Sequence, residues 1–202
     1  MDVTKFLFFY NGGAMNYYNY EDYDICVCEA PTYSFNSADN KYYDKVISIE
    51  TTDFNKCIEI AINKAESTKT ILLVVSYYTP ISSCVVASTT GLFLMLDSVI
   101  CILNLETLEI SKQEELNTMG TMFEAHSYED DYILYGEMEI YRISSELKVV
   151  WQFSARDIFV RYQGEEPAFE MKQDRICLID FLDNYYEIDY DGNVLLDKPM
   201  KE

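Results

Sequence analysis

The strongest constraint on the fold is a repeated order of strand, tight turn, strand, turn and strand in the second half of the chain. The clearest copy covers residues 174–196, a second covers 132–151, and a weaker third covers 92–110. Superposing the copies on matching apolar positions gives steps of 38 and 45 residues between Leu105, Ile143 and Ile188. This order is typical of β-propeller blades. Three copies cannot close a ring of four or more blades, so we expect an open stack of propeller-like antiparallel sheets, or a smaller α+β body.

Strand patterns occur both inside and outside these copies. Segments rich in Val, Ile, Leu and Tyr are separated by Ser, Thr, Gly and Pro, as is typical of short strands. They predict strands at residues 6–10, 23–28, 45–49, 70–77, 83–88, 92–96, 99–105, 122–125, 132–135, 139–143, 149–153, 158–161, 168–171, 176–179, 185–190 and 194–196. Many evenly spaced strands favour antiparallel sheets.

One helix is expected, near residues 53–66. Asp53 can cap its first turn. Apolar residues then fall at helical spacing on one face, namely Phe54, Cys57, Ile58, Ala61, Ile62 and Ala65. The predicted class is therefore mainly β (α+β), with antiparallel propeller-like sheets and one substantial helix. We expect a single domain over 1–202, with a mixed part at about 1–90 and a repeat-like all-β part at about 91–197.

The chain is strongly acidic. It has 35 acidic and 15 basic residues among 202, for a net charge of −20, and residues 102–202 alone carry 23 acids and 9 bases. This balance argues against direct binding of nucleic acid and against docking on anionic membranes. An acidic surface attracts basic protein partners and speeds their encounter. The simplest alternative is that the charge only keeps the protein soluble.

The sequence predicts a cytoplasmic protein. No secretory signal pattern is visible near the first residues. The longest apolar runs, 71–75 and 92–96, are much shorter than the about 20 residues that a membrane span needs.

No catalytic residue or cofactor is predicted. The only histidine is His126, and neither a Gly-x-Ser-x-Gly motif nor a glycine-rich phosphate loop is present. An enzyme would have to use His126 or carboxylates as its base.

No metal site is predicted either. Five of the six cysteines, including Cys26 and Cys28, lie in apolar stretches and are expected to act as small hydrophobic residues. Cys26 and Cys28 share one strand face, but no second pair has zinc spacing. The segment Glu187-x-Asp189-x-Asp191-Gly192 imitates the start of a calcium loop, yet its twelfth position is Lys198, which favours a hairpin turn.

The segment from Trp151 to Met171 is the most distinctive. It sets Arg156 and Asp157 between apolar strands, either as a structural ion pair or as part of a binding surface. The block Trp151–Gly164, followed by Asp174–Gly192 with Phe181 and Asp183-Asn184-Tyr185-Tyr186, resembles the small acidic immunity proteins found beside bacterial polymorphic toxins. The resemblance covers about residues 130–197. It implies an intracellular protein that binds the toxin domain of a contact-dependent or secreted toxin, with no catalytic residues of its own.

The resemblance and the charge together give the functional hypothesis. Many such toxins are nucleases, which need a basic surface to hold phosphates, and an acidic partner can occupy that surface. We expect an immunity protein that occludes the active site of a cognate basic toxin domain. The candidate contacts, each of which could instead be a solvated loop residue, are Tyr128, Glu129, Asp130, Asp131, Tyr162, Glu165, Glu166, Asp183 and Tyr185. The alternatives are an intracellular propeller-like interaction scaffold and an enzyme that uses His126 and carboxylates.

Overall fold

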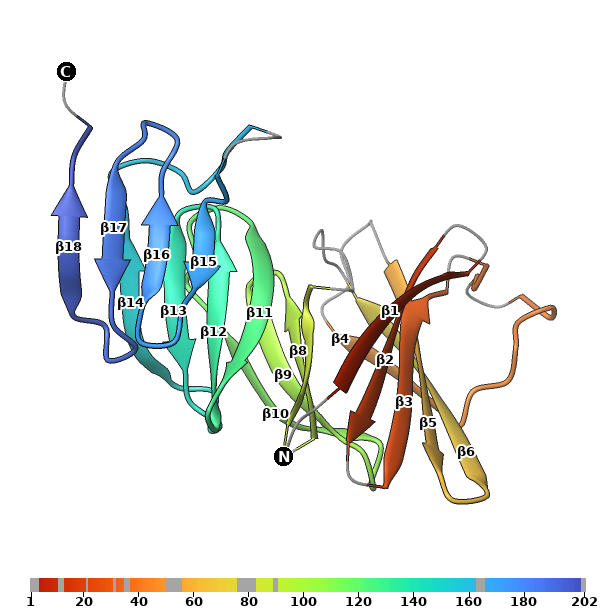
Figure 1. The fold of residues 1–202 in the computed structure, drawn as a ribbon. Helices are drawn as coiled ribbons and strands as arrows, with labels where there is room; N and C mark the ends of the chain where they lie inside the picture. Colours follow the sequence, from red (N-terminus) through yellow and green to blue (C-terminus); the bar gives the residue numbers. More distant parts are fainter. Residues whose placement is uncertain are drawn as a thin grey trace. The chain divides into compact units, whose positions relative to one another are not determined.

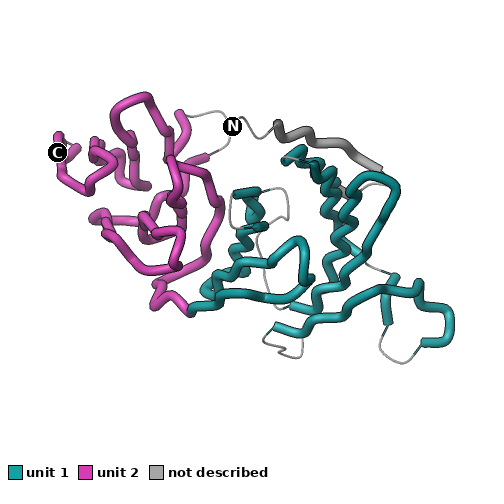
Figure 2. The backbone as a smooth tube through the Cα atoms, turned by 90° about the horizontal axis from the view of Figure 1, so that it is seen from below, with its two compact units in different colours: residues 1–114 teal, residues 115–202 magenta. Residues whose placement is uncertain are grey.

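The structure is a computed structural model that describes residues 4–10, 13–20, 22–30, 32–34, 37–49, 56–75, 83–88, 91–162 and 166–200. Within residues 4–14 it describes the backbone only. The described residues form strands, turns and loops, with no helix among them. The chain divides into two compact units, residues 1–114 and 115–202 (Figure 2), and each unit is described by itself.

The first unit contains a six-stranded sheet (Figure 1). Its strand order is β1-β2-β3-β5-β6-β4, and all pairs are antiparallel except β4 with β6. The strands are β1 (Thr4–Tyr10), β2 (Gly13–Tyr20), β3 (Tyr23–Glu29), β4 (Lys45–Ile49), β5 (Lys56–Lys64) and β6 (Ser67–Val75).

The predicted helix at 53–66 is wrong. From Lys56 onward the segment is strand β5, followed by a turn at residues 65–66, while residues 53–55 lie outside the described part. Ile58, Ile60 and Ile62 alternate into the core, because β3 and β6 pair with β5 on its two sides. The apolar residues of this segment fit a period of two as well as a helical period, and β-branched isoleucines favour the pleated conformation.

The second sheet of this unit has the order β10-β9-β8-β7. Its strands are β7 (Val85–Ser88), β8 (Gly91–Leu96), β9 (Val99–Asn104) and β10 (Glu109–Glu115). Every residue of β8 is buried, which explains its continuous apolar run. The Tyr18 hydroxyl of β2 donates to the Val85 carbonyl of β7 at 3.1 Å and ties the two sheets together.

The second unit consists of two four-stranded sheets, each with its strands in sequence order. The first contains β11 (Met122–Tyr128), β12 (Asp131–Gly136), β13 (Glu139–Ile143) and β14 (Val149–Ser154). The second contains β15 (Phe169–Met171), β16 (Ile176–Ile179), β17 (Tyr185–Ile188) and β18 (Val194–Lys198). One apolar core joins them, in which Ile133, Tyr135 and Ile140 pack with Leu178, Tyr186 and Ile188.

The repeated pattern corresponds to the last three strands of each four-stranded sheet. The superposed positions 105, 143 and 188 lie at or directly after the ends of β9, β13 and β17, the third strand of each sheet. The mainly β class and the antiparallel sheets are therefore confirmed. The predicted strand at 158–161 is wrong: this segment is a loop, which Phe159 anchors through its backbone bonds to Glu137 and to the Tyr135 hydroxyl.

Candidate functional site

The predicted contact residues fall in three places of the second unit. Tyr128, Glu129, Asp130 and Asp131 surround the β11–β12 turn at one end of its strands (Figure 1). Tyr162 and Asp183 lie at the other end, beside the β16–β17 turn. Glu166 and Tyr185 line a groove on the β15–β18 sheet. Glu165 lies outside the described residues.

At the β11–β12 turn, Asp131 and Tyr128 make contacts with other segments of the second unit. Asp131 accepts hydrogen bonds from Arg142 Nε at 2.7 Å and from the Ser145 backbone N–H at 3.3 Å. The Tyr128 ring stacks on Tyr190 at 3.9 Å between centroids, and burial raises the pKa of Tyr128. Of the predicted residues here, only Glu129 and Asp130 are exposed.

The β16–β17 turn is fixed by Asp180, a residue that the sequence analysis did not single out. Its carboxylate is fully buried. It accepts hydrogen bonds from the backbone N–H groups of Leu182 and Asn184, both at 3.0 Å, from the Asn184 amide and from the Tyr186 hydroxyl at 2.9 Å. Tyr186 in turn accepts from the Arg156 guanidinium at 3.1 Å. Each donor replaces water around a buried anion, so the turn has one well-defined conformation.

This rigid turn presents apolar side chains to solvent. Phe181 is 41% exposed and Leu182 is 56% exposed. The ring of Tyr162, 69% exposed, lies 5.7 Å from that of Phe181. Asp183, in the left-handed region at φ 61°, forms an ion pair with Arg161 at the margin. We call Tyr162, Phe181 and Leu182 the turn surface.

Two further turns have the same backbone but different side chains. In the turns that begin at Ser144 and Asp189, as at Asp180, the first residue donates its N–H to the carbonyl four residues later. Its side chain accepts from the N–H of that fifth residue. The Asp189 turn is the segment that imitates a calcium loop. Here the Asp189 carboxylate accepts hydrogen bonds from the backbone N–H groups of Asp191 and Asn193 and from the Asn193 side-chain amide. Of these three turns, the one at Asp180 alone carries two consecutive exposed apolar residues.

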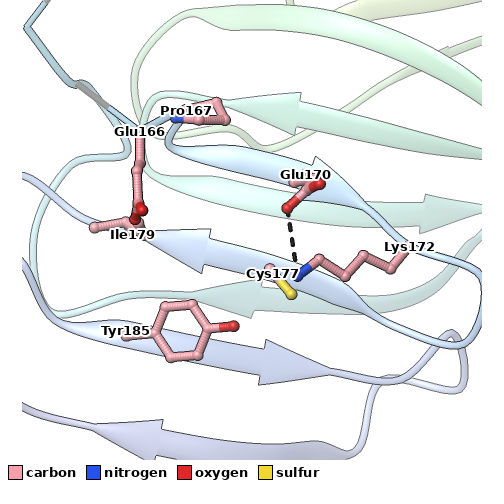
Figure 3. Close-up of a pocket in the computed structure, with 7 residues that line it drawn as sticks. All are labelled: Glu166, Pro167, Glu170, Lys172, Cys177, Ile179 and Tyr185. Atoms are coloured by element: carbon pink, nitrogen blue, oxygen red, sulfur yellow. Dashed lines mark ion pairs between the residues drawn. The ribbon is translucent and has the colours of Figure 1, made fainter. Parts of the chain in front are cut away.

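The groove on the β15–β18 sheet is polar, with apolar walls (Figure 3). It encloses about 410 Å³ and is lined by Glu166, Pro167, Glu170, Lys172, Cys177, Ile179 and Tyr185. Lys172 Nζ lies 3.5 Å from Glu170, and the Tyr185 hydroxyl donates to Glu187 at 2.8 Å. Contact with Cys177 raises the pKa values of both Lys172 and Tyr185 above their ordinary values.

The open question about Arg156 has a structural answer. Its guanidinium forms a two-pronged ion pair with Asp197 of β18, at 2.6 and 2.7 Å. His126 of β11 lies 2.9 Å from Glu124, and its ring stacks on Phe169 at 5.2 Å. His126 is not among the residues that line the groove.

No group of three or more His, Cys, Asp or Glu side chains among the described residues is arranged to hold a metal ion. No helix in that part of the chain has the length and apolar character to cross a membrane.

Comparisons with known proteins identify no family. No family model matches the chain. No curated protein matches it either. Among solved structures, BamB from Moraxella catarrhalis is 8% identical, with 96% of this chain covered and a TM-score of 0.46. A protein of unknown function from Bacteroides caccae is 14% identical over 98% of this chain and 78% of its own, with a TM-score of 0.42. The AfRom2 CNH domain is 9% identical over 93% of this chain and 68% of its own, with a TM-score of 0.40. The chain spans 63% of the BamB structure, which is less than two thirds, and these similarities carry no argument about function.

Proposed function

We propose that this chain is a non-catalytic protein-binding module that docks on a basic protein domain through the turn surface. In its specific form, the proposal is an immunity protein that neutralises a cognate toxin domain, such as a nuclease, by occluding its active site. The observation that carries the proposal is the pair Phe181 and Leu182, exposed on a turn that the Asp180 network holds rigid.

The geometry of the turn favours binding energetically. Aromatic side chains on a rigid loop lose little conformational entropy when a partner covers them. Tyr162 and Phe181 are such anchors, because each already contacts the other.

Charge supplies the selectivity for a basic partner. Residues 115–202 contain 20 acidic and 8 basic residues, a net charge of −12. This field accelerates the encounter with a basic domain and disfavours acidic ones. The shared strand order of the two sheets in the second unit also supports a propeller-like arrangement of those two sheets, which is compatible with the alternative of an interaction scaffold.

The first experiment uses the C-terminal domain of the protein encoded by the adjacent upstream gene. Its affinity for this chain is measured by calorimetry at two salt concentrations, and its toxicity is measured with and without co-expression. We expect tight binding that weakens with salt, together with restored growth. Binding that leaves the partner's activity intact would favour the scaffold, and no binding with no restored growth would overturn immunity to that neighbour.

A matched pair of variants tests the surface. Leu182→Asp places a charge on the turn surface, whereas Leu195→Asp makes the same change at a similarly exposed position of β18. We expect Leu182→Asp to weaken binding about 100-fold and Leu195→Asp to leave it nearly unchanged. Equal effects of the two variants would contradict the assignment of the surface.

A further inference from the structure

The outward face of the six-stranded sheet in the first unit carries four sulfur atoms among the described residues: three on the paired strands β2 and β3, and that of Cys57, two residues from Glu59 on β5. In β3, Ile25 and Val27 point into the core and are fully buried, so Cys26 and Cys28 lie on the opposite face, where both are half-buried. The β2–β3 register places Met15 directly opposite Cys28, and Met15 is also half-buried. Directly opposed residues of an antiparallel pair share a face and have Cβ atoms about 5 Å apart. We call Met15, Cys26 and Cys28 the sulfur face.

The two thiols already contact each other. The side chains of Cys26 and Cys28 are hydrogen-bonded, and the Tyr17 side chain is hydrogen-bonded to Cys26. Opposite Cys28 on β5 lies Glu59, which Lys41 Nζ contacts at 2.6 Å and the Tyr43 hydroxyl at 3.0 Å. Glu59 is therefore engaged by other side chains, and the sulfur atoms are the groups left to bind a ligand.

The backbone opposes a disulfide between these cysteines. A strand rises about 3.3 Å per residue, so same-face neighbours two residues apart have their Cα and Cβ atoms about 6.6 Å apart. A disulfide needs Cβ atoms about 3.5–4.5 Å apart. Because β3 is paired with both β2 and β5 at Cys26 and Cys28, closing that gap would break the ladder on both sides. The strand therefore holds the thiols near each other as a reduced pair.

We propose that the sulfur face binds one soft monovalent metal ion, with Cu(I) as the ion that fits its chemistry. Thiolate and thioether sulfurs select Cu(I), and two or three sulfur ligands satisfy it. Binding replaces whatever thiol protons the two cysteines still carry with two metal–sulfur bonds, and it changes no oxidation state. Zinc needs four ligands, and no third His, Cys, Asp or Glu of the described residues is placed to help. This inference is independent of the proposed function.

The test is an anaerobic titration of the reduced chain with Cu(I) held by a coloured competing chelator. We expect one Cu(I) ion per chain to be removed from the chelator. In the same samples, alkylation followed by mass spectrometry should show that Cu(I) protects Cys26 and Cys28 but leaves Cys177, in the second unit, as reactive as before. Protection spread over all cysteines would overturn the site, and so would equal protection by Zn(II). This readout needs no variant and so does not depend on whether a variant folds.

Variants then assign the ligands. The double variant Cys26→Ser, Cys28→Ser should no longer bind the one Cu(I) ion per chain. Met15→Leu should lower the affinity for Cu(I) without abolishing binding. Cys177→Ser, in β16 of the second unit, is the control and should bind as the unmodified chain does. Thermal unfolding of each variant checks that the sheet remains folded. Undiminished binding by the double variant would overturn the proposal.

Discussion

Asn16 of β2 is a polar residue in an apolar setting. It is fully buried on the inward face that it shares with Tyr18. Neither polar atom of its side chain has a hydrogen-bond partner among the residues that the structure describes. A buried amide without partners costs about 1–3 kcal/mol of stability.

Replacing Asn16 should therefore stabilise the protein. We expect Asn16→Leu to raise the free energy of unfolding by about 1–2 kcal/mol in urea titrations. The leucine side chain branches at Cγ as that of asparagine does, and it has no polar atom that needs a hydrogen-bond partner. Asn19→Leu is the control, since Asn19 lies exposed on the opposite face of the same strand. A loss of stability in Asn16→Leu would show that Asn16 has a partner, such as a buried water.

Cys26 and Cys57 should differ in reactivity in the metal-free protein. The hydrogen bond from Cys28 lowers the pKa of the Cys26 thiol to about 7, whereas burial raises the pKa of Cys57. Since thiolates are the reactive form, alkylation of Cys26 should reach half its maximum near pH 7 and that of Cys57 only well above it. Mass spectrometry of timed samples resolves both residues, and Cys28→Ala should move the Cys26 profile to higher pH. Coincident profiles for Cys26 and Cys57 would contradict the assigned hydrogen bond.

Among the turns, the one at Asp180 should contribute most to stability. We expect Asp180→Ala to lower the free energy of unfolding by about 2–4 kcal/mol, because it leaves several buried donors without an acceptor. Asp189→Ala removes the same type of turn contact at a half-exposed site and should cost clearly less, because water can replace the lost acceptor there. Urea titrations of the two variants measure the difference, and equal losses would contradict the buried network.

The β15–β18 sheet should lose stability in acid. Its hydrogen bonds lower the pKa values of several carboxyl groups, Glu187 through Tyr185 and Arg175, Asp189 through Asn193, and Asp197 through Arg156. A pKa that is lower in the folded state gives stability that is present above the unfolded value and disappears as the pH falls through the folded one. We expect hydrogen exchange of β17 to accelerate below about pH 4, and Arg175→Gln to weaken this dependence. Exchange that is independent of pH, after correction for the intrinsic rate, would contradict it.

For the whole molecule, the net charge of −20 works against the folded state. Like charges held close together repel, and salt screens them. We expect the thermal midpoint to rise between low ionic strength and about 1 M sodium chloride, where the screening length is about 3 Å. Asp130→Lys, at an exposed turn position, should raise the midpoint at low salt and have little effect at high salt. A midpoint that falls with salt would show that attractive ion pairs dominate.

Local pattern was sufficient for much of the β architecture. Three strands have the predicted bounds, namely Lys45–Ile49, Glu139–Ile143 and Ile176–Ile179. Their β-branched and aromatic residues favour the strand conformation, and the turn residues that follow mark where each strand ends. The repeated strand order also follows from the sequence, since turns that repeat at a fixed spacing impose sequential pairing. Strand β2, which has Asn and Tyr in place of Val, Ile and Leu, was missed, and β10 was predicted only at its first residues, as the end of the 92–110 copy.

The sequence by itself determined the β class, the repeated strand order and the acidic charge. Tertiary structure decided the rest, because it depends on pairing between distant segments. Strand β5 took the place of a helix once β3 and β6 paired with it, and Met15 came to face Cys28 through the β2–β3 register. Likewise, the predicted contact residues separated into three places, and Asp180 became the anchor of an exposed apolar turn. A side-chain period restricts which local conformations are possible, but only long-range hydrogen bonding and burial select one of them.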